Sequence, residues 1–410
     1  DYAFANCPVC TPSRAMMLTG LYPLRNKTLA NDLPLPPEVP SFGAIARAAG
    51  YRTGYVGKWH LDGVPRDRFT PPGPRRHGFD YWAAFNCSHD YYDGRYYRDT
   101  PEPIAVSGYE AAGQTELSLE FLRNGDEPFC LYLSWGPPHN PYEAAPPEYL
   151  ARYQPTALTL RDNVPLHCRE QAARDYAGYY AHISALDEQL GRLVDALQER
   201  GILERTIFVF TSDHGDMLFS HGRQRKQQPW DESVRIPFLI SWPGHIPAGT
   251  RTSALLSTVD FMPTLLSLMG INGRFDMQGT DLSSVALGRA EQGPSTIWLM
   301  DVVSVDEGRN MGVREWRGLR TARYTYARFT DGEPWVLFDN AKDGWQVHNL
   351  ALEPSAQELR LRLEDELSAW LRAHNDDSAP WDVLIRRMGL AELWNARERE
   401  LHPQNPRLLR

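Results

Sequence analysis

The chain lacks long apolar runs and has few cysteines, and each shortage excludes a class of protein. In its 410 residues no stretch reaches the roughly 18 consecutive apolar residues that a membrane span requires. The five cysteines are too few and too scattered for a disulfide framework in a chain of this length. The first residues also lack the charged-then-apolar layout of a signal peptide, so the given sequence shows no targeting signal.

An excess of basic residues is also missing. The 43 lysines and arginines are outnumbered by 52 acidic residues, which gives a formal net charge of −9. No basic run is long enough to indicate nucleic acid as the main partner. With 42% hydrophobic and 23% charged residues, the composition is that of a globular protein with one large or two medium domains. A neutral or anionic substrate in a local positive pocket is compatible with it.

Short apolar runs alternate with helical patterns over the first two thirds of the chain. The helical patterns are Ser41–Ala49, followed by Gly50, and the long amphipathic stretch Tyr176–Arg200, followed by Gly201. This alternation predicts an α/β domain with a largely parallel sheet. Ligands of such domains bind at the carboxyl ends of the strands. The predicted strands are Tyr51–Val56, Phe129–Trp135, Thr206–Thr211 and Pro237–Trp242.

The pattern changes near residue 295. Strands joined by tight turns are predicted, followed by a charged amphipathic helix at Pro354–His374. We therefore expect two domains, an α/β domain over 1–294 and a smaller α+β domain over 295–410. The arginine-rich end, Asn395–Arg410, is expected to be a surface tail or a docking strand. The predicted strands of this part are Ser295–Met300, Gly318–Phe329 and Pro334–Phe338.

The densest motif is Cys-Pro-Val-Cys-Thr-Pro-Ser-Arg, which begins at Cys7. Pro12 is placed near the start of a helix that ends at Gly20, so Cys10 is expected at the helix N-terminus. Backbone N–H groups and the helix dipole favour an anion there, and Arg14 adds a fixed positive charge one turn on. The residues alone also allow a buried structural cysteine, a redox pair or half of a zinc site. Zinc is disfavoured because no second Cys-x-x-Cys or paired histidine spacing follows.

The segment Cys10–Arg14 resembles the Cys-x-Pro-x-Arg signature of type I sulfatases, in the alkaline-phosphatase superfamily. Further motifs similar to those of the family follow in the same order over nearly the whole chain. The resemblance implies a large mixed, mostly parallel sheet sandwiched by helices, with a smaller C-terminal α+β domain. It also implies hydrolysis of a sulfate ester to an alcohol and inorganic sulfate. The further motifs are Gly57-Lys58-Trp59-His60, Pro138-His139-Asn140-Pro141-Tyr142, Thr211-Ser212-Asp213-His214-Gly215-Asp216 and Lys226.

The resemblance implies a role for each of these residues. Cys10 is oxidised to formylglycine by a maturation enzyme, and the hydrated aldehyde offers a nucleophilic hydroxyl and a second hydroxyl that drives sulfate release. Lys58 and Lys226 hold sulfate oxygens and the hydrated aldehyde, since a compact ammonium is a good point charge for an anion. His60 is assigned to the elimination step, and His139 to the leaving group or a sulfate oxygen.

A metal pair follows the strand that ends at Thr211. By resemblance, Asp213 and His214 bind a divalent ion together with Cys10, and His214 stands where many members have asparagine. Carboxylate-rich sites favour Ca²⁺, with Mg²⁺ or Mn²⁺ as alternatives, and an imidazole weakens that preference. The tetrapeptide Asp213–Asp216 alone also fits a turn with a capping aspartate.

One departure from the family concerns the metal. The family's first strand ends in two metal-binding aspartates well before the cysteine signature, whereas only nine residues precede Cys10 here. We therefore expect that an N-terminal segment is missing and that the chain by itself folds poorly and is inactive. The compartment stays open, with a periplasmic or secreted location favoured over the cytoplasm.

Other functions fit the same motifs. A phosphonate monoester or phosphodiester hydrolase on this fold is the nearest, because sulfur and phosphorus centres share a tetrahedral anionic geometry. A non-catalytic sulfoglycan-binding pseudoenzyme is a third hypothesis. The expected partner is a sulfated small molecule or saccharide, with no nucleic acid. The aromatic cluster over Tyr81–Tyr97 is either a sugar- or aryl-facing wall or packing beneath a long loop.

Overall fold

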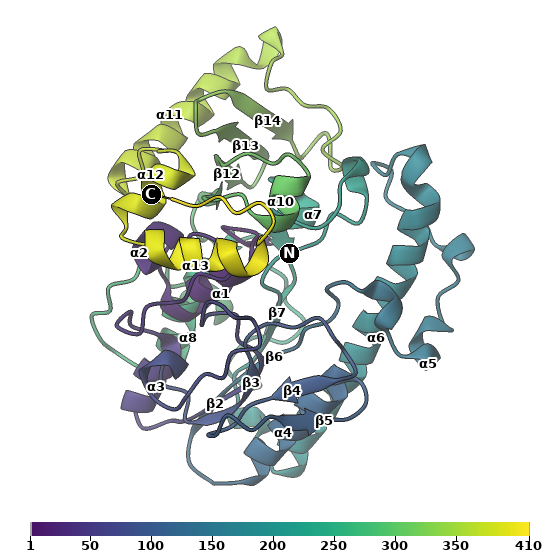
Figure 1. The fold of residues 1–410 in the computed structure, drawn as a ribbon, viewed down its shortest axis with the longest axis vertical. Coiled ribbons are helices and arrows are strands. Elements are labelled where there is room, and N and C mark those ends of the chain that lie inside the picture. The colour runs from purple at the N-terminus through teal and green to yellow at the C-terminus, as the bar shows by residue number, and fades with distance from the viewer. Residues whose placement is uncertain (1, 410) are drawn as a thin grey trace.

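The computed structural model describes residues 2–409. A three-stranded parallel sheet forms the centre of the N-terminal part, with β2 (Arg52–Lys58) between β3 (Tyr81–Phe85) and β6 (Phe129–Ser134) (Figure 1). Strands β2 and β6 confirm two of the predicted strands to within two residues. From Thr53 onward β2 is buried, as a central strand covered on both faces should be.

The other strands of this part lie in separate small sheets. Strand β7 (Phe208–Thr211) pairs antiparallel with β9 (Phe238–Ser241). Strand β1 (Ala3–Phe4) lies between β10 (Leu256–Ser257) and β8 (Arg235–Ile236). The α/β architecture is confirmed. The single large, mostly parallel sheet is not formed within residues 2–409, because no strand pairing joins β6 to β7.

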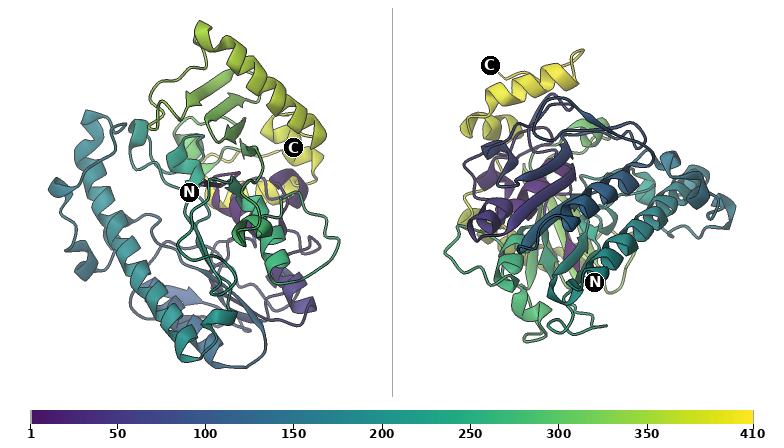
Figure 2. Two further views of the ribbon diagram at one scale, coloured as in Figure 1. Left: turned by 180° about the vertical axis from the view of Figure 1, so that it is seen from behind. Right: turned by 90° about the horizontal axis from the view of Figure 1, so that it is seen from below.

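Helices cover the strands. The first, α1 (Cys10–Thr19), ends as predicted at Gly20, whose φ of 63° is left-handed and whose N–H donates to the Met16 carbonyl at 2.8 Å. The long helix α6 (Arg169–Glu199) starts seven residues before its predicted start and runs along one flank (Figure 2). No helix within residues 2–409 is long and apolar enough to cross a membrane. The other helices of this part are α2 (Pro23–Asn26), α3 (Phe42–Ala48), α4 (Glu110–Arg123), α5 (Pro147–Leu150), α7 (Asp231–Val234), α8 (Phe261–Leu268) and α9 (Ser283–Ala286).

A four-stranded antiparallel sheet forms the C-terminal part, with α11 (Gln357–Ala373) against it. One long strand was predicted over Gly318–Phe329, but the chain turns after Thr321. The Thr321 hydroxyl accepts the backbone N–H of Tyr324 at 2.8 Å, a local bond that competes with the strand ladder. The strands are β11 (Thr296–Asp301), β12 (Trp316–Thr321), β13 (Tyr324–Phe329) and β14 (Pro334–Asp339).

The prediction of a surface tail or docking strand for Asn395–Arg410 is wrong for residues 395–401, which belong to a packed helix, while Arg410 lies outside the described residues. Helix α13 (Ala391–Leu401) crosses the front of the molecule in Figure 1 and buries Trp394 completely. Arg397 is also fully buried, because it donates to the Asn31 carbonyl at 2.8 Å and pairs with Asp306 at 2.7 Å. Arginine content indicated a solvated tail, whereas these partners permit burial. The remaining short elements are β4 (Gly94–Tyr96), β5 (Ile104–Val106), α10 (Asp306–Asn310) and α12 (Trp381–Arg387).

Candidate active site

Cys10 is the first residue of α1 and lies where the carboxyl ends of three strands meet. Its side chain is buried at 3% exposure. Lys58 ends β2 and Ser134 ends β6, while Asp213 follows β7. The structure therefore brings the sequence motifs together at this edge, as the position of each motif after a predicted strand indicated.

Positive charge surrounds the Cys10 sulfur. His214 Nε2 lies 3.2 Å from Sγ and Lys58 Nζ lies 4.0 Å from it. Burial would raise the pKa of the thiol, but the charges of Lys226, Lys58 and His214 outweigh burial and bring this pKa well below its usual value. The site stabilises a negative charge at position 10.

Arg14 connects the elements that form the site. Its Nη2 pairs with Asp213 Oδ2 at 3.0 Å, and its Nη1 donates to the Lys58 carbonyl at 3.0 Å and to Ser134 Oγ at 2.6 Å. Burial opposes the charge, yet Asp213 keeps the pKa of Arg14 above its usual value. The guanidinium thereby joins α1 to the ends of β2 and β6 and to the loop after β7.

Lys226 and His139 form a contact near Cys10. Lys226 Nζ lies 2.7 Å from His139 Nε2, and His139 Nδ1 lies 3.0 Å from the Asn140 carbonyl. Burial and the charge of Lys226 lower the pKa of His139 well below its usual value. The imidazole is therefore neutral, with Nδ1–H donating to the carbonyl and Nε2 accepting from the ammonium.

His89 belongs to the same group of side chains, although no motif pointed to it. Its ring stacks on that of His139 with 4.2 Å between centroids, and its Nε2 lies 3.4 Å from Lys58 Nζ. In the sequence His89 lies among aromatic residues with no distinguishing spacing. Of the aromatic cluster, Trp82, Tyr91 and Tyr96 are buried and act as packing residues, whereas Tyr92 is 40% exposed and stays compatible with a sugar- or aryl-facing wall.

His60 faces a carboxylate that no sequence motif marked. Its Nε2 lies 3.0 Å from Asp32 Oδ1, and both side chains are buried. Burial would lower the pKa of His60, but the charges of Cys87 and Asp32 raise this pKa to about 10. The other ring nitrogen, Nδ1, has no hydrogen-bond partner in the part of the chain from residue 2 to 409.

Three ligand atoms are placed to hold one metal ion. The nearest ligand atoms of Cys10, Asp213 and His214 all lie within 4.8 Å of one another. His214 Nδ1 contacts the Gly215 carbonyl at 2.9 Å, which leaves Nε2 toward the cluster. One carboxylate, one imidazole and one sulfur fit one side of a coordination shell, whereas a hard cation takes six or more oxygen ligands.

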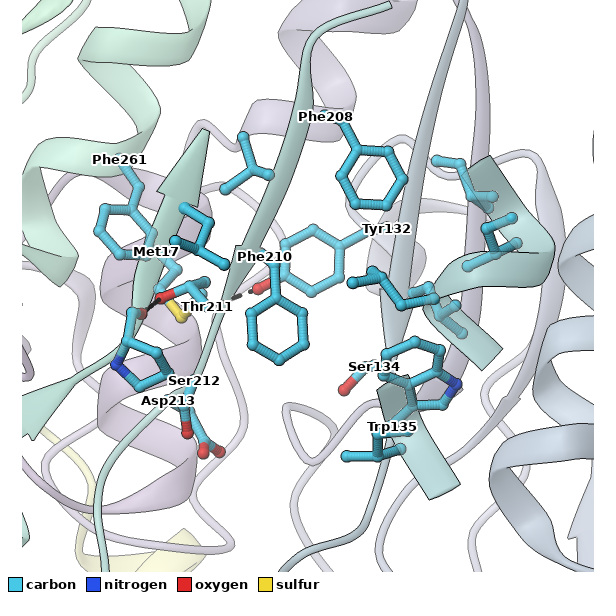
Figure 3. Close-up of a pocket in the computed structure, with 18 of the residues that line it drawn as sticks. Met17, Tyr132, Ser134, Trp135, Phe208, Phe210, Thr211, Ser212, Asp213 and Phe261 are labelled. Carbon is cyan, nitrogen blue, oxygen red and sulfur yellow. Dashed lines mark hydrogen bonds between the residues drawn. The ribbon is translucent and has the colours of Figure 1, made fainter. Parts of the chain in front are cut away.

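A cavity of about 1630 Å³ adjoins these three residues, and they line one end of it. It lies between β6 and β7, where Tyr132, Phe208 and Phe210 point into the space (Figure 3). Within residues 2–409, β6 pairs only with β2 and β7 only with β9, so their facing edges are unpaired. An apolar slot with open strand edges therefore leads to the candidate metal ligands.

Comparison with known proteins identifies the family to which the chain belongs. The profile of the sulfatase family matches residues 2–271, and that of the C-terminal part of N-sulphoglucosamine sulphohydrolase matches residues 220–373. The chain belongs to the sulfatase family. It is an enzyme of the sulfuric ester hydrolase class in the alkaline-phosphatase superfamily, as the motif order predicted.

Two relatives of this sulfatase carry the name of a saccharide. An ulvan-active sulfatase of Formosa agariphila is 38% identical over 388 residues, which cover 93% of this chain and 75% of that protein. An N-acetylglucosamine-6-O-sulfatase of Bacteroides thetaiotaomicron is 26% identical, over 85% of this chain and 75% of the relative.

Solved structures share the fold. A sulfatase yidJ structure from Bacteroides fragilis superposes with a TM-score of 0.84 at 30% identity, covering 92% of this chain and 88% of the other. A phosphonate monoester hydrolase of Agrobacterium radiobacter gives a TM-score of 0.72 at 23% identity, over 91% and 88% of the two chains. The second likeness shows the fold alone.

Proposed function

We propose that this sulfatase removes sulfate from a sulfated saccharide by means of a formylglycine made from Cys10. The observation that carries the proposal is the position of Cys10, buried at a helix N-terminus with Lys58 and His214 beside its sulfur. The names of the two relatives support a saccharide substrate.

The charges of the site suit a sulfate ester. Its sulfur is shielded by negative oxygens, which an enzyme must neutralise before a nucleophile can approach. Lys58 and Lys226 hold those oxygens in our proposal, and Arg14 keeps the strand ends in place around them. The hydrated aldehyde at position 10, when present, supplies the attacking hydroxyl and a second hydroxyl that permits sulfate release.

The histidines hold or move protons. His139 Nε2 accepts a hydrogen bond from Lys226, so this pair can deliver a proton to the departing oxygen of the alcohol. We assign His60 to the elimination step, in which Nδ1–H of the ring, kept protonated by its raised pKa, donates to an oxygen of the group at position 10. Because the two histidines approach the site from different loops, one serves the leaving group and the other serves sulfate release.

Cys10, Asp213 and His214 are the proposed metal ligands, with Ca²⁺ preferred and Mg²⁺ or Mn²⁺ as alternatives. A bound ion would add positive charge against a sulfate oxygen. The missing oxygen ligands are expected on the side of the cavity. Cys10, Asp213 and His214 line that cavity, so further oxygen ligands can approach them from it.

The experiment measures the mass of the peptide around residue 10 and the rate of sulfate release. The full-length protein is produced beside a formylglycine-generating enzyme, and the mass of the peptide that contains residue 10 is measured. We expect an aldehyde at position 10, Ca²⁺-dependent sulfate release from a sulfated oligosaccharide, and loss of release in Cys10→Ala. Cys7→Ala is the matched control, because Cys7 is a buried thiol three residues upstream.

Each of the other possible results points to a different conclusion about the function. An unmodified thiol together with no sulfate release would contradict the proposal. Faster turnover of an aryl phosphonate or phosphodiester than of an aryl sulfate would assign the hydrolase alternative. Saccharide binding by the aldehyde-containing protein without turnover would assign the pseudoenzyme.

A further inference from the structure

We propose that Asp32 is a positioning residue that fixes the His60 ring so that its Nδ1 faces position 10. This inference rests on the proposed function, because it concerns the imidazole assigned there to sulfate release. It is carried by the contact between Asp32 Oδ1 and His60 Nε2 at 3.0 Å and by the surroundings of both residues.

Asp32 is held more firmly than a loop carboxylate usually is. It lies after α2 and is 1% exposed. Arg66 binds it through two bonds, Nε to Oδ1 at 2.9 Å and Nη2 to Oδ2 at 2.8 Å. A bidentate arginine compensates the buried charge and fixes the plane of the carboxylate. Oδ1 therefore has one direction left in which to accept a hydrogen bond, and His60 occupies it.

The same loop is tied to the helix that starts at Cys10. Asn31 Oδ1 accepts the backbone N–H of Thr11 at 2.9 Å. Thr11 Oγ1 donates to the His60 carbonyl at 2.8 Å and accepts the Asp32 N–H at 3.2 Å. Asn31, Asp32, Thr11 and His60 thus form one frame, in which the ring of His60 and the start of the helix are fixed relative to each other.

The backbone supports a functional reading of this frame. Asp32 and His60 both have left-handed conformations, with φ of 65° and 55°. Residues other than glycine adopt such angles at a cost, and they collect at sites where the surroundings force a particular geometry. Arg397 of α13, far along the chain, donates to the Asn31 carbonyl at 2.8 Å and so also holds the loop that contains Asp32.

The contact with Asp32 leaves the two ring nitrogens of His60 in different roles. With Nε2 engaged by Asp32, Nδ1 is the ring nitrogen of His60 left for chemistry. Within residues 2–409 it has no hydrogen-bond partner, and the thiols of Cys10 and Cys87 are the sulfur groups near the ring. A buried polar atom without a partner is costly, which a substrate or a hydroxyl at position 10 would relieve. A rotated ring would present carbon to position 10 instead.

The chain offers a matched control. Asp62 is also a buried carboxylate, 3% exposed, and it is also bound by an arginine, Arg75, whose Nε donates to Oδ1 at 2.7 Å. Asp62 touches no histidine in the hydrogen bonds described for residues 2–409. Asp32→Asn and Asp62→Asn therefore remove the same charge from similar surroundings, and only the first acts on His60.

The first measurement requires no turnover. In proton and nitrogen NMR spectra of histidine-labelled protein, assigned with His60→Gln, we expect a strongly downfield proton on His60 Nε2. This signal should move upfield or vanish in Asp32→Asn and stay in Asp62→Asn. An identical His60 signal in Asp32→Asn and the parent protein would overturn the proposal.

The second measurement uses protein that carries formylglycine. We expect Asp32→Asn to lower kcat for sulfate release by at least about tenfold with KM nearly unchanged, within the range for a displaced acid–base group. Asp32→Glu, which restores the charge, should regain part of the rate. Equal losses of kcat in Asp32→Asn and Asp62→Asn, or a change in KM alone, would also overturn the proposal. The expected NMR shift without sulfate release by the parent protein would support the positioning contact and contradict the proposed function.

Discussion

Arg14 and Asp213 form a buried ion pair, with 3.0 Å between Nη2 and Oδ2. The pair joins the helix that begins at Cys10 to the loop that carries two of the proposed metal ligands. Through Nη1, Arg14 also holds the ends of β2 and β6. One side chain therefore links the helix of the proposed nucleophile to Lys58, Ser134 and the proposed metal ligand Asp213.

Removing Arg14 should destabilise the protein strongly. In Arg14→Met the largely buried Asp213 carboxylate loses its arginine partner and keeps a 3.7 Å contact with His214 Nε2, so the loss of unfolding free energy is up to about 3–5 kcal/mol. Urea unfolding measures the change. Arg25→Met is the control, since Arg25 pairs with Asp276 on the surface and should change stability by less than about 1 kcal/mol. Equal effects of the two substitutions would contradict the structural role of Arg14.

Replacing Lys226 should change His139 as well as the rate. In Lys226→Met the nearby ammonium is lost, so the pKa of His139 should rise toward its ordinary value. NMR titration of His139 reports this rise. Turnover should fall by about 10²–10³, the usual effect of losing one stabilising group. Lys342→Met, at an exposed lysine, should change neither quantity, and an unmoved His139 pKa in Lys226→Met would argue against the contact.

Glu110 should make stability depend on pH. Burial raises the pKa of this carboxyl from 4.5 to about 8, so between these values the folded protein holds a proton that the unfolded chain releases. The free energy of unfolding should therefore fall as pH rises from 5 to 8, by a few kcal/mol in order of magnitude.

Glu110→Gln should remove that fall, because the amide does not ionise. Urea midpoints at pH 5, 7 and 9 test it. Glu116→Gln lies on the exposed side of the same helix and should keep the pH dependence of the parent. Parallel curves for the parent and Glu110→Gln would show that Glu110 does not carry the effect.

Metal binding should depend on Asp213. Calorimetric titration of the formylglycine-containing protein with Ca²⁺ should show at least about tenfold weaker binding in Asp213→Asn, because a carboxylate ligand becomes an amide. A chelator should stop sulfate release by the parent protein. Asp80→Asn removes an exposed carboxylate and should leave the affinity unchanged. Unaltered Ca²⁺ affinity in Asp213→Asn would place the ion elsewhere.

The local sequence was sufficient for much of the fold and of the site. The helix that starts at Cys10 and ends at Gly20 followed from a proline near one end and a glycine at the other. The strands before Lys58 and Asp213 followed from short β-branched and aromatic runs bounded by polar residues. Because the carboxyl ends of parallel strands meet at one edge of a sheet, the motifs that follow these strands were expected to lie together.

Sheet pairing and side-chain partners required the tertiary structure. Asp32, His89 and Ser134 contribute to the site through contacts with residues at least 28 positions away, and no periodic pattern marks them. The arginine-rich end had the composition of a solvated tail, yet Arg397 is buried because Asn31 and Asp306 satisfy its donors.

The sequence by itself determined the family and which residues are proposed to carry the chemistry, because the spacing of cysteine, lysines, histidines and aspartate after short strands is a local property. Only the tertiary structure decided how those residues are held. Ion pairs such as Arg14 with Asp213, and hydrogen bonds such as Asp32 with His60, depend on distances between segments that the fold alone brings together.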